Sequence, residues 1–235
     1  MLPLADHNPR RTTPVVNIIL IVINVLMFFW ELQLQASRVL EPALMSVAFV
    51  PVRFWNAPGA LLPNVVTMFV SMFLHGGWLH LGGNMLYLWI FGDNIEDRLG
   101  HGKYLFFYLA CGLLATLAHA VMNPGSDVPS IGASGAIAGV LGAYIVLFPK
   151  QRVTTLIPIF IFITVREVPA IFLLGFWIVM QLFFGAASMG GDLQRSGGVA
   201  YFAHIGGFVA GMVLITLLGG RRPPPRPAYQ DYWRR

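Results

Sequence analysis

The stretch VPSIGASGAIAGVLGAY, residues 128–144, decides the architecture that we expect for this chain. From Ser134 onward it contains almost only small and apolar residues, as a segment inside a membrane does. Gly135 and Gly139 are four residues apart, with Gly142 beyond, so a neighbouring helix backbone can approach closely. The stretch therefore predicts a membrane helix that begins near Ser134 and packs tightly against another helix.

The composition of the whole chain supports a membrane location. Of its 235 residues, 57% are hydrophobic and only 11% are charged, whereas a soluble domain has about 25% charged residues. The single cysteine, Cys111, lies in an apolar stretch and excludes a disulfide framework or a cysteine-based metal site. We expect one integral membrane domain, built as a helix bundle, with no metal and no other cofactor.

Six apolar segments are long enough to cross a bilayer, on the criterion of roughly 17–25 residues per helix. They are residues 15–31, 74–93, 103–122, 133–148, 168–187 and 201–219. The fourth is short, which suits a helix that begins inside the membrane. Another apolar stretch, residues 153–165, is too short and contains Pro158, so we expect it to be an interfacial loop. The predicted fold class is all-α: a polytopic bundle of six transmembrane helices.

The distribution of lysine and arginine predicts the orientation of the bundle. If the N-terminus is inside, the inner segments hold 12 of the 15 basic residues and the outer segments hold 3. The outer ones are Arg38, Arg53 and Arg195. Both termini are therefore expected in the cytoplasm, and the net charge of +5 reflects topology rather than a nucleic-acid partner. The expected organisation is a cytoplasmic segment (1–14), a six-helix membrane domain (15–220) and a basic, proline-rich cytoplasmic tail (221–235).

Five polar residues lie near the outer ends of three different segments, and His75 in the second segment is one of them. His80 and Asn84 lie in the second segment, Ser134 begins the fourth, and His204 lies near the start of the sixth. Taken singly, each would more often be a helix-packing or interfacial residue. At a rise of 1.5 Å per residue they can share one depth, and polar groups inside a membrane usually face one another or a cavity. Together they predict one outward-opening polar site.

The residue types suit nucleophilic catalysis by Ser134. Gly132 and Gly135 flank this serine and allow a tight turn into the helix. The N–H groups at a helix N-terminus favour a developing negative charge. His80 and Asn84 are spaced i, i+4, so they share a helix face from which both can donate hydrogen bonds to an oxyanion.

His204 is the candidate general base. Gly207 and Gly211 lie on its helix face and allow the close packing that would bring His204 toward Ser134. No Asp or Glu lies within the fourth or sixth segment. The sequence therefore predicts a Ser–His dyad, in which His204 acts as base and then as acid, rather than a triad.

These motifs, taken together, resemble the rhomboid family of intramembrane serine proteases. The matching elements, over roughly residues 65–215, are GASG (132–135), AHIGG (203–207) with Gly211, HGGWLHLGGN (75–84) and EDRLG (96–100). GxSG alone is a weak signal. The combination, in this order and topology, is highly specific.

The resemblance implies a serine endopeptidase that cleaves in or beside transmembrane segments of other membrane proteins. Ser134 would be the nucleophile and His204 the base. His80 and Asn84, with the backbone N–H of Ser134, would hold the oxyanion. Residues 32–73 would form a membrane-embedded first loop, and the fifth segment, with Phe172 and Trp177, would flank substrate access. The implied partners are transmembrane substrates and the lipid bilayer of the cell (inner or plasma) membrane, with no particular oligomeric state.

The chain departs from the family pattern at two positions. Some members carry an aromatic residue four positions after the serine, against which the histidine packs, whereas this chain has Ala138. Some carry Trp-Arg in the first loop, where this chain has RFWN (53–56). The support of His204 and the anchoring of the first loop are therefore open.

A non-catalytic membrane protein is the alternative. It would be a small transporter or an inactive rhomboid-like protein that binds client helices. A transporter would be expected to show internal repeats, and the sequence contains no convincing one. An inactive relative would usually lack the serine or the histidine, and both are present.

Overall fold

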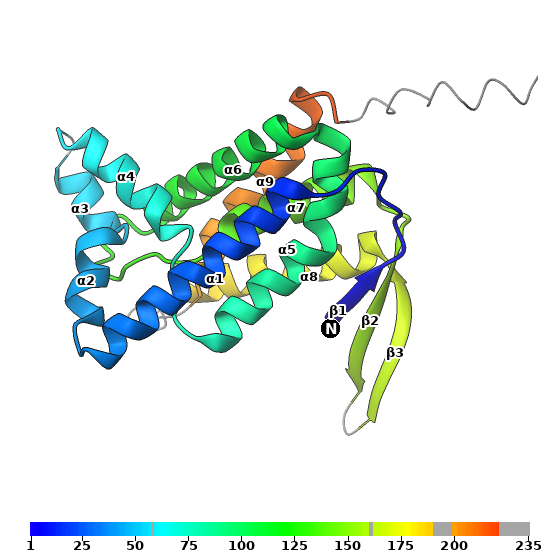
Figure 1. Ribbon diagram of the computed structural model, residues 1–235, viewed down its shortest axis with the longest axis horizontal. Coiled ribbons are helices and arrows are strands. Elements are labelled where there is room, and N and C mark those ends of the chain that lie inside the picture. The colour runs from blue at the N-terminus through cyan, green and yellow to red at the C-terminus, as the bar shows by residue number, and fades with distance from the viewer. Residues whose placement is uncertain (58, 160–161, 190–198, 221–235) are drawn as a thin grey trace, which may run out of the picture.

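The computed structural model describes residues 1–57, 59–159, 162–189 and 199–220. Helices dominate these residues (Figure 1). The helices are α1 (Val15–Ala36), α2 (Leu40–Val47), α3 (Pro51–Asn56), α4 (Leu61–Ser71), α5 (Trp78–Leu99), α6 (His101–Met122), α7 (Ser134–Leu147), α8 (Ala170–Ser188) and α9 (Tyr201–Leu217). The strands are β1 (Leu2–Asp6), β2 (Arg152–Ile159) and β3 (Phe162–Pro169).

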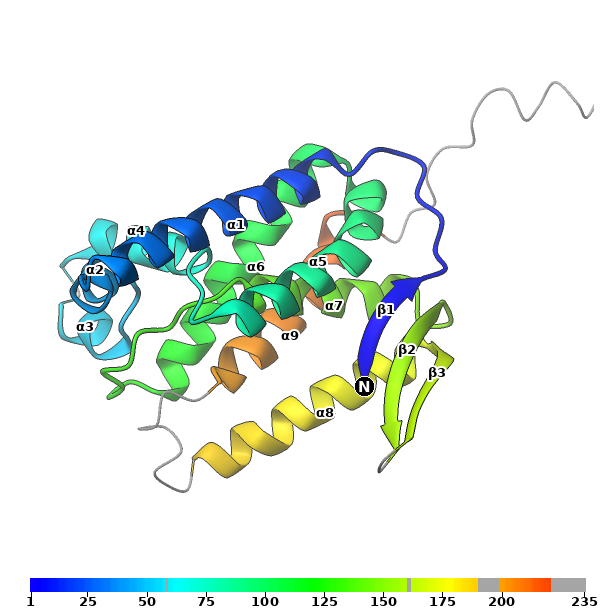
Figure 2. The same cartoon turned by 60° about the horizontal axis from the view of Figure 1, so that its bottom comes forward.

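Helix α7 is the centre of the bundle. It packs against α5, α6 and α9 (Figure 2), and every residue from Gly135 to Tyr144 is buried. A helix that is apolar all round is stable only where neighbours surround it. The short stretch that begins at Ser134 is therefore the core around which the longer helices are arranged.

The outer helices have the properties of membrane spans. Three helices, α1, α6 and α8, are long and apolar enough to cross a membrane, while α4, α7 and α9 are shorter apolar helices. Large apolar side chains of α8 are exposed, among them Phe172, Val179 and Phe183. A surface of this kind is stable against lipid rather than water. The described residues therefore form a helical membrane bundle.

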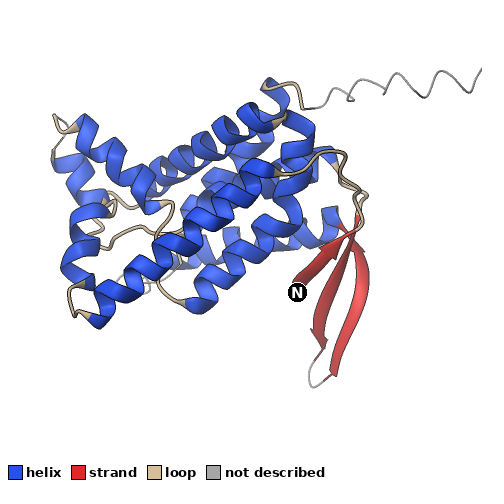
Figure 3. Ribbon diagram, viewed as in Figure 1, coloured by secondary structure: helices blue, strands red, loops and turns tan. Residues whose placement is uncertain are grey.

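The all-α prediction is wrong for two segments, which form a three-stranded antiparallel sheet of order β1-β2-β3 (Figure 3). The expected interfacial loop at 153–165 belongs to the hairpin of β2 and β3. Its Val, Ile, Thr and Phe residues favour strands, and Pro158 disfavours a helix. Because β1 pairs with β2 only between Val153 and Leu156, Pro158 lies where β2 has no second neighbour, which is where a strand tolerates proline.

The described part of the first loop, residues 32–73, is largely helical. Helices α2, α3 and α4 gather at one end of the bundle (Figure 1), and Phe49 and Met68 form a small core with Ala120 of α6. The indole N–H of Trp55, in the RFWN segment, donates to the carbonyl of Ala120 at 2.9 Å. This bond anchors α3 to α6.

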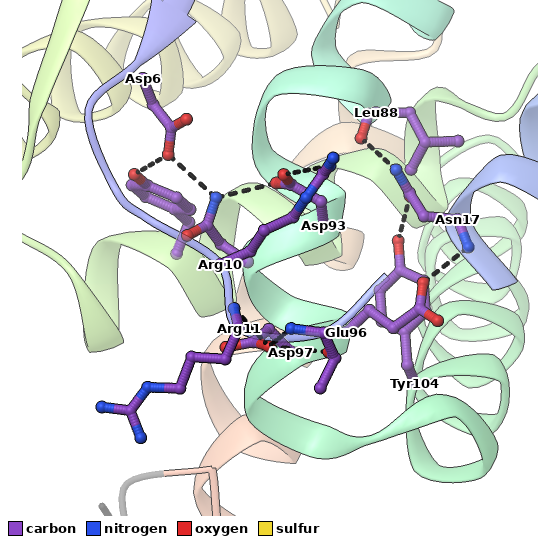
Figure 4. Close-up of polar contacts among 12 residues, drawn as sticks. Asp6, Arg10, Arg11, Asn17, Leu88, Asp93, Glu96, Asp97 and Tyr104 are labelled. Carbon is purple, nitrogen blue, oxygen red and sulfur yellow. Dashed lines mark hydrogen bonds and ion pairs between the residues drawn. The ribbon is translucent and has the colours of Figure 1, made fainter. Parts of the chain in front are cut away.

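A polar network fixes the N-terminal segment to the opposite end of the bundle (Figure 4). The carboxylate of Glu96 is fully buried and accepts the backbone N–H groups of Val16 and Asn17 at 2.9 and 2.7 Å. It thereby satisfies the first turn of α1, which has no side-chain cap of its own. Asp97 accepts the N–H groups of Arg11 and Thr12. The EDRLG motif thus holds the chain where it enters α1.

Candidate functional site

Ser134 and His204 are in direct contact. His204 Nε2 lies 2.8 Å from Ser134 Oγ, although 70 residues separate them in sequence. Each lies at the start of its helix, Ser134 as the first residue of α7 and His204 in the first turn of α9. His204 is only 9% exposed, so this hydrogen bond is largely sheltered from solvent.

Glycines on the two helices make this contact possible. A Cβ atom on Gly207 would lie 2.0 Å from the carbonyl oxygen of Gly135, and one on Gly142 would lie 2.0 Å from that of Phe208. Any side chain at either position would force the helices apart. The predicted small-residue faces of α7 and α9 therefore pack against each other, as expected from the sequence.

The start of α7 offers backbone donors beside Ser134. The first helical hydrogen bond runs from the N–H of Ile137 to the carbonyl of Ala133 at 3.0 Å, so the preceding amides have no partner further back in the helix. Gly132 turns the chain into the helix with φ of 125°, and its N–H donates to the carbonyl of Ser71. The turn is therefore anchored, and the positive end of the α7 dipole faces Ser134 Oγ.

His80 lies on the same side of Gly132 as Ser134. A Cβ atom on Gly132 would lie 2.8 Å from His80 Nε2 and 3.6 Å from Ser134 Oγ. The N–H of Gly76 donates to His80 Nδ1 at 3.3 Å, so in the neutral ring Nε2 carries the proton and can donate it. The structure thus places His80 Nε2, as an available donor, next to Gly132 on the side where Ser134 Oγ lies.

Asn84 has a different immediate partner. Its Nδ2 lies 3.0 Å from His75 Nε2, and both side chains are buried. The backbone N–H of His75 in turn donates to the carboxylate of Glu31 at 3.0 and 3.1 Å. Sequence reasoning missed Glu31, although a carboxylate at the end of an apolar segment is a recognisable signal. The structure pairs Asn84 with His75 rather than with Ser134.

Helix α8 supports His204, which sequence reasoning did not foresee. Gln181 Oε1 lies 2.8 Å from His204 Nδ1. The ring of Trp177 lies 5.7 Å from the His204 ring, between centroids, at an interplanar angle of 38°. Trp177 therefore packs against His204, as the aromatic residue does in family members that have one at the position of Ala138. The available signal was an amide four residues after a tryptophan, on one face of an apolar segment.

Two cavities adjoin these residues. One of about 20 Å³ lies beside Ser134, with Ser71, Thr116 and Ser130 in its lining, and is large enough for about one water molecule. A larger cavity of about 240 Å³ lies between α5 and α8. It is lined by Met1, Tyr87, Leu173, Leu174, Phe176, Trp177, Met180 and Phe184. Among the described residues, no group of three or more His, Cys, Asp or Glu side chains could hold a metal ion.

Comparison with known proteins identifies the class to which this fold and site belong. The family model described as the Rhomboid domain matches residues 62–221, which is about two thirds of the chain. The chain belongs to the rhomboid family.

Several relatives within this family are similar to the chain. It is 36% identical over 146 residues to "Rhomboid protease GluP" of Bacillus subtilis, which covers 62% of this chain and 24% of that protein. It is 34% identical over 152 residues to "Rhomboid protein 1, mitochondrial" of Saccharomyces cerevisiae, covering 63% and 40%. It is 30% identical over 148 residues to human "Presenilin-associated rhomboid-like protein, mitochondrial", covering 60% and 39%. The matched region thus spans between about a quarter and two fifths of these relatives' lengths.

Proposed function

We propose that this chain is an intramembrane serine endopeptidase that cleaves transmembrane segments of other membrane proteins. The observation that carries the proposal is the 2.8 Å contact between His204 Nε2 and Ser134 Oγ, which has the geometry of a nucleophile and its general base. Membership of the rhomboid family and the name of the Bacillus subtilis relative support the same activity.

In the proposed reaction, Ser134 Oγ attacks the carbonyl carbon of the scissile peptide while His204 Nε2 takes its proton. The tetrahedral intermediate then collapses. The C–N bond breaks, and His204 returns the proton to the leaving amine. A water molecule hydrolyses the resulting acyl-enzyme with His204 again as base, which releases the acid and restores Ser134.

We assign oxyanion stabilisation to the backbone N–H of Ser134, to His80 and to Asn84. The N-terminal position of Ser134 in α7 favours negative charge at this point. The proximity of His80 Nε2 to Gly132 supports a direct role for His80. Asn84 is hydrogen-bonded to His75. It can therefore contact the oxyanion only if this bond opens, and otherwise it contributes through neighbouring residues.

We further propose six membrane spans, formed by α1, α5, α6, α7, α8 and α9. The protein would lie in the inner or plasma membrane of the cell, with both termini in the cytoplasm. The 12-to-3 distribution of basic residues supports this orientation. The apolar cavity between α5 and α8 is the proposed access route for a substrate helix.

The test is cleavage of a single-span membrane substrate by purified protein, compared with Ser134→Ala and His204→Ala. We expect both substitutions to abolish cleavage while the proteins remain folded. A fluorophosphonate probe should label the wild type and leave Ser134→Ala unlabelled. Cleavage that persists in Ser134→Ala, or a wild type that is neither labelled nor active, would instead support the non-catalytic alternative.

A further inference from the structure

The hydrogen bond between Gln181 and His204 bears on which imidazole nitrogen carries the proton. The Gln181 atom 2.8 Å from His204 Nδ1 is the amide oxygen Oε1, which can only accept a hydrogen bond. With the amide in this orientation, His204 Nδ1 carries the proton. In the neutral ring this leaves the lone pair on Nε2, the atom that lies 2.8 Å from Ser134 Oγ.

We propose that Gln181 is a positioning residue whose amide oxygen fixes the tautomer and the ring orientation of His204. The inference rests on the proposed protease function and adds a third member to its Ser–His pair. Without an acceptor at Nδ1, the more stable tautomer of the buried ring carries its proton on Nε2, from which it can donate a hydrogen bond to Ser134 Oγ. In that tautomer His204 cannot act as a base toward Ser134.

The second support of the ring comes from the same face of α8. Trp177 lies one turn before Gln181, and its ring packs against His204 at a centroid distance of 5.7 Å. It also contacts Phe208 of α9 at 6.1 Å. Trp177 thus limits tilting of the imidazole while Gln181 limits its rotation, and the low exposure of His204 strengthens a hydrogen bond that solvent does not screen.

The choice of an amide over a carboxylate fits the surroundings of the site. A charged side chain within a membrane helix is costly, and α8 has exposed apolar side chains on both sides of Gln181, at Val179 and Leu182. A glutamine offers the acceptor that His204 needs without a formal charge. It stabilises the imidazolium less than a carboxylate would. Replacement of Gln181 by glutamate should therefore shift the pH–rate profile in a known direction.

The experiment compares three full-length variants in detergent or liposomes, with a single-span membrane substrate. Gln181→Met keeps nearly the length of the side chain but removes the amide acceptor. Gln181→Glu keeps an acceptor and adds a carboxylate. Leu182→Met is the matched control at the adjacent, half-exposed position.

We expect Gln181→Met to lower kcat by about tenfold to a hundredfold, as when the hydrogen-bond partner that orients a metal-ligating histidine is lost, with KM unchanged. We expect Gln181→Glu to retain kcat within about threefold of the wild type, because the acceptor that orients the ring is kept. The acid limb of the pH–rate profile of Gln181→Glu should move to higher pH, since a carboxylate stabilises the imidazolium. Fluorophosphonate labelling of Ser134 should slow in Gln181→Met in parallel with kcat. Leu182→Met should match the wild type.

Three results would overturn the inference. Wild-type kcat in Gln181→Met shows that the bond has no catalytic effect, and an equal loss in Gln181→Glu shows a packing role only. If Gln181→Met does not fold, a pH–rate profile of folded Gln181→Glu that matches the wild type would by itself overturn the inference. Failure of the protease proposal gives a different pattern, because the wild type itself would then lack activity that depends on Ser134.

Discussion

Gly211 of α9 and Gly139 of α7 are so close that a Cβ atom on Gly211 would lie 1.9 Å from the carbonyl oxygen of Gly139. This contact is one turn deeper than the one between Gly207 and Gly135. The two helices are therefore in backbone contact along their shared face. The position of His204 relative to Ser134 depends on this spacing.

Gly211→Ala should reduce both stability and activity. The added methyl group meets backbone rather than a flexible side chain, and overpacking of this kind costs about 1–3 kcal/mol. Separation of the helices lengthens the His204–Ser134 contact, so we expect at least a tenfold loss of kcat, which 1.4 kcal/mol in the barrier would produce. Thermal unfolding and substrate cleavage measure the two effects. Gly102→Ala is the control, because its Cβ meets nothing within 4 Å, and a comparable loss there would contradict this explanation.

His80→Ala and Asn84→Ala should have different effects. His80 lies beside Ser134 with a donor available, so its loss should lower kcat by about 10²–10³-fold, as for an oxyanion-hole donor. Asn84→Ala leaves His75 Nε2 buried without its partner, so it should lower the unfolding temperature more than His80→Ala does. The measurements are kcat and thermal unfolding for each variant. A larger loss of kcat in Asn84→Ala would assign the main oxyanion contact to Asn84 instead.

Glu96→Ala should destabilise the protein without touching the reacting groups. The substitution removes the acceptor for the N–H groups of Val16 and Asn17, and leaving buried donors unsatisfied costs about 1–3 kcal/mol. Glu96→Gln retains one acceptor oxygen and should lose less. Glu41→Ala, at an exposed position of α2, should change the unfolding free energy by less than about 0.5 kcal/mol. Equal stability of Glu96→Ala and Glu41→Ala would contradict the capping role.

The attachment of β1 to β2 and to Tyr144 of α7 should weaken as pH rises. Burial raises the pKa of Asp6 from 3.8 to about 6, and the nearby Asp93 carboxylate acts in the same direction, while the hydrogen bond from Tyr144 opposes them. A raised pKa means that the folded state binds the proton more tightly than the unfolded state. The stabilisation is therefore complete below about pH 4 and is lost as pH rises through about 6.

Hydrogen exchange of the β1 amides, corrected for the intrinsic pH dependence, measures this effect. The protection of wild-type β1 should fall between about pH 4 and pH 7, the interval that spans the two pKa values of Asp6. Asp6→Asn keeps an oxygen acceptor without a titrating group, so its protection should be flat over the same interval. An identical fall in both proteins would assign the change to another group.

The small-residue pattern predicted the centre of the fold because its effect is local and steric. Glycine spacing alone sets how closely α7 and α9 can approach, and the contact of Ser134 with His204 follows from it. His80 was predicted from a different signal, the helix face that it shares with Asn84 and the depth that it shares with Ser134. These inferences needed only helix geometry and the cost of isolated polar groups in a membrane.

The sheet and the support of His204 depend on tertiary contacts that periodicity does not report. Residues 2–6 become a strand because β2 provides a partner about 150 residues away, and no local signal marks that pairing. Gln181 lies on a helix that flanks the pair, and its role depends on how α8 rotates against α9. Propensity in the hairpin favours strands, but the loop prediction rested on the short length of the stretch and on Pro158.

The pairing of β1 with β2 also depends on the helices between them. Leu2 pairs with Leu156, so helices α1 through α7 all lie between the two paired strands in sequence. Closing so long a loop is entropically unfavourable unless the intervening helices have already packed. Pairing of β1 with β2 is therefore favoured by packing of the intervening helices α1 to α7, because that packing shortens the distance that the two strands must bridge.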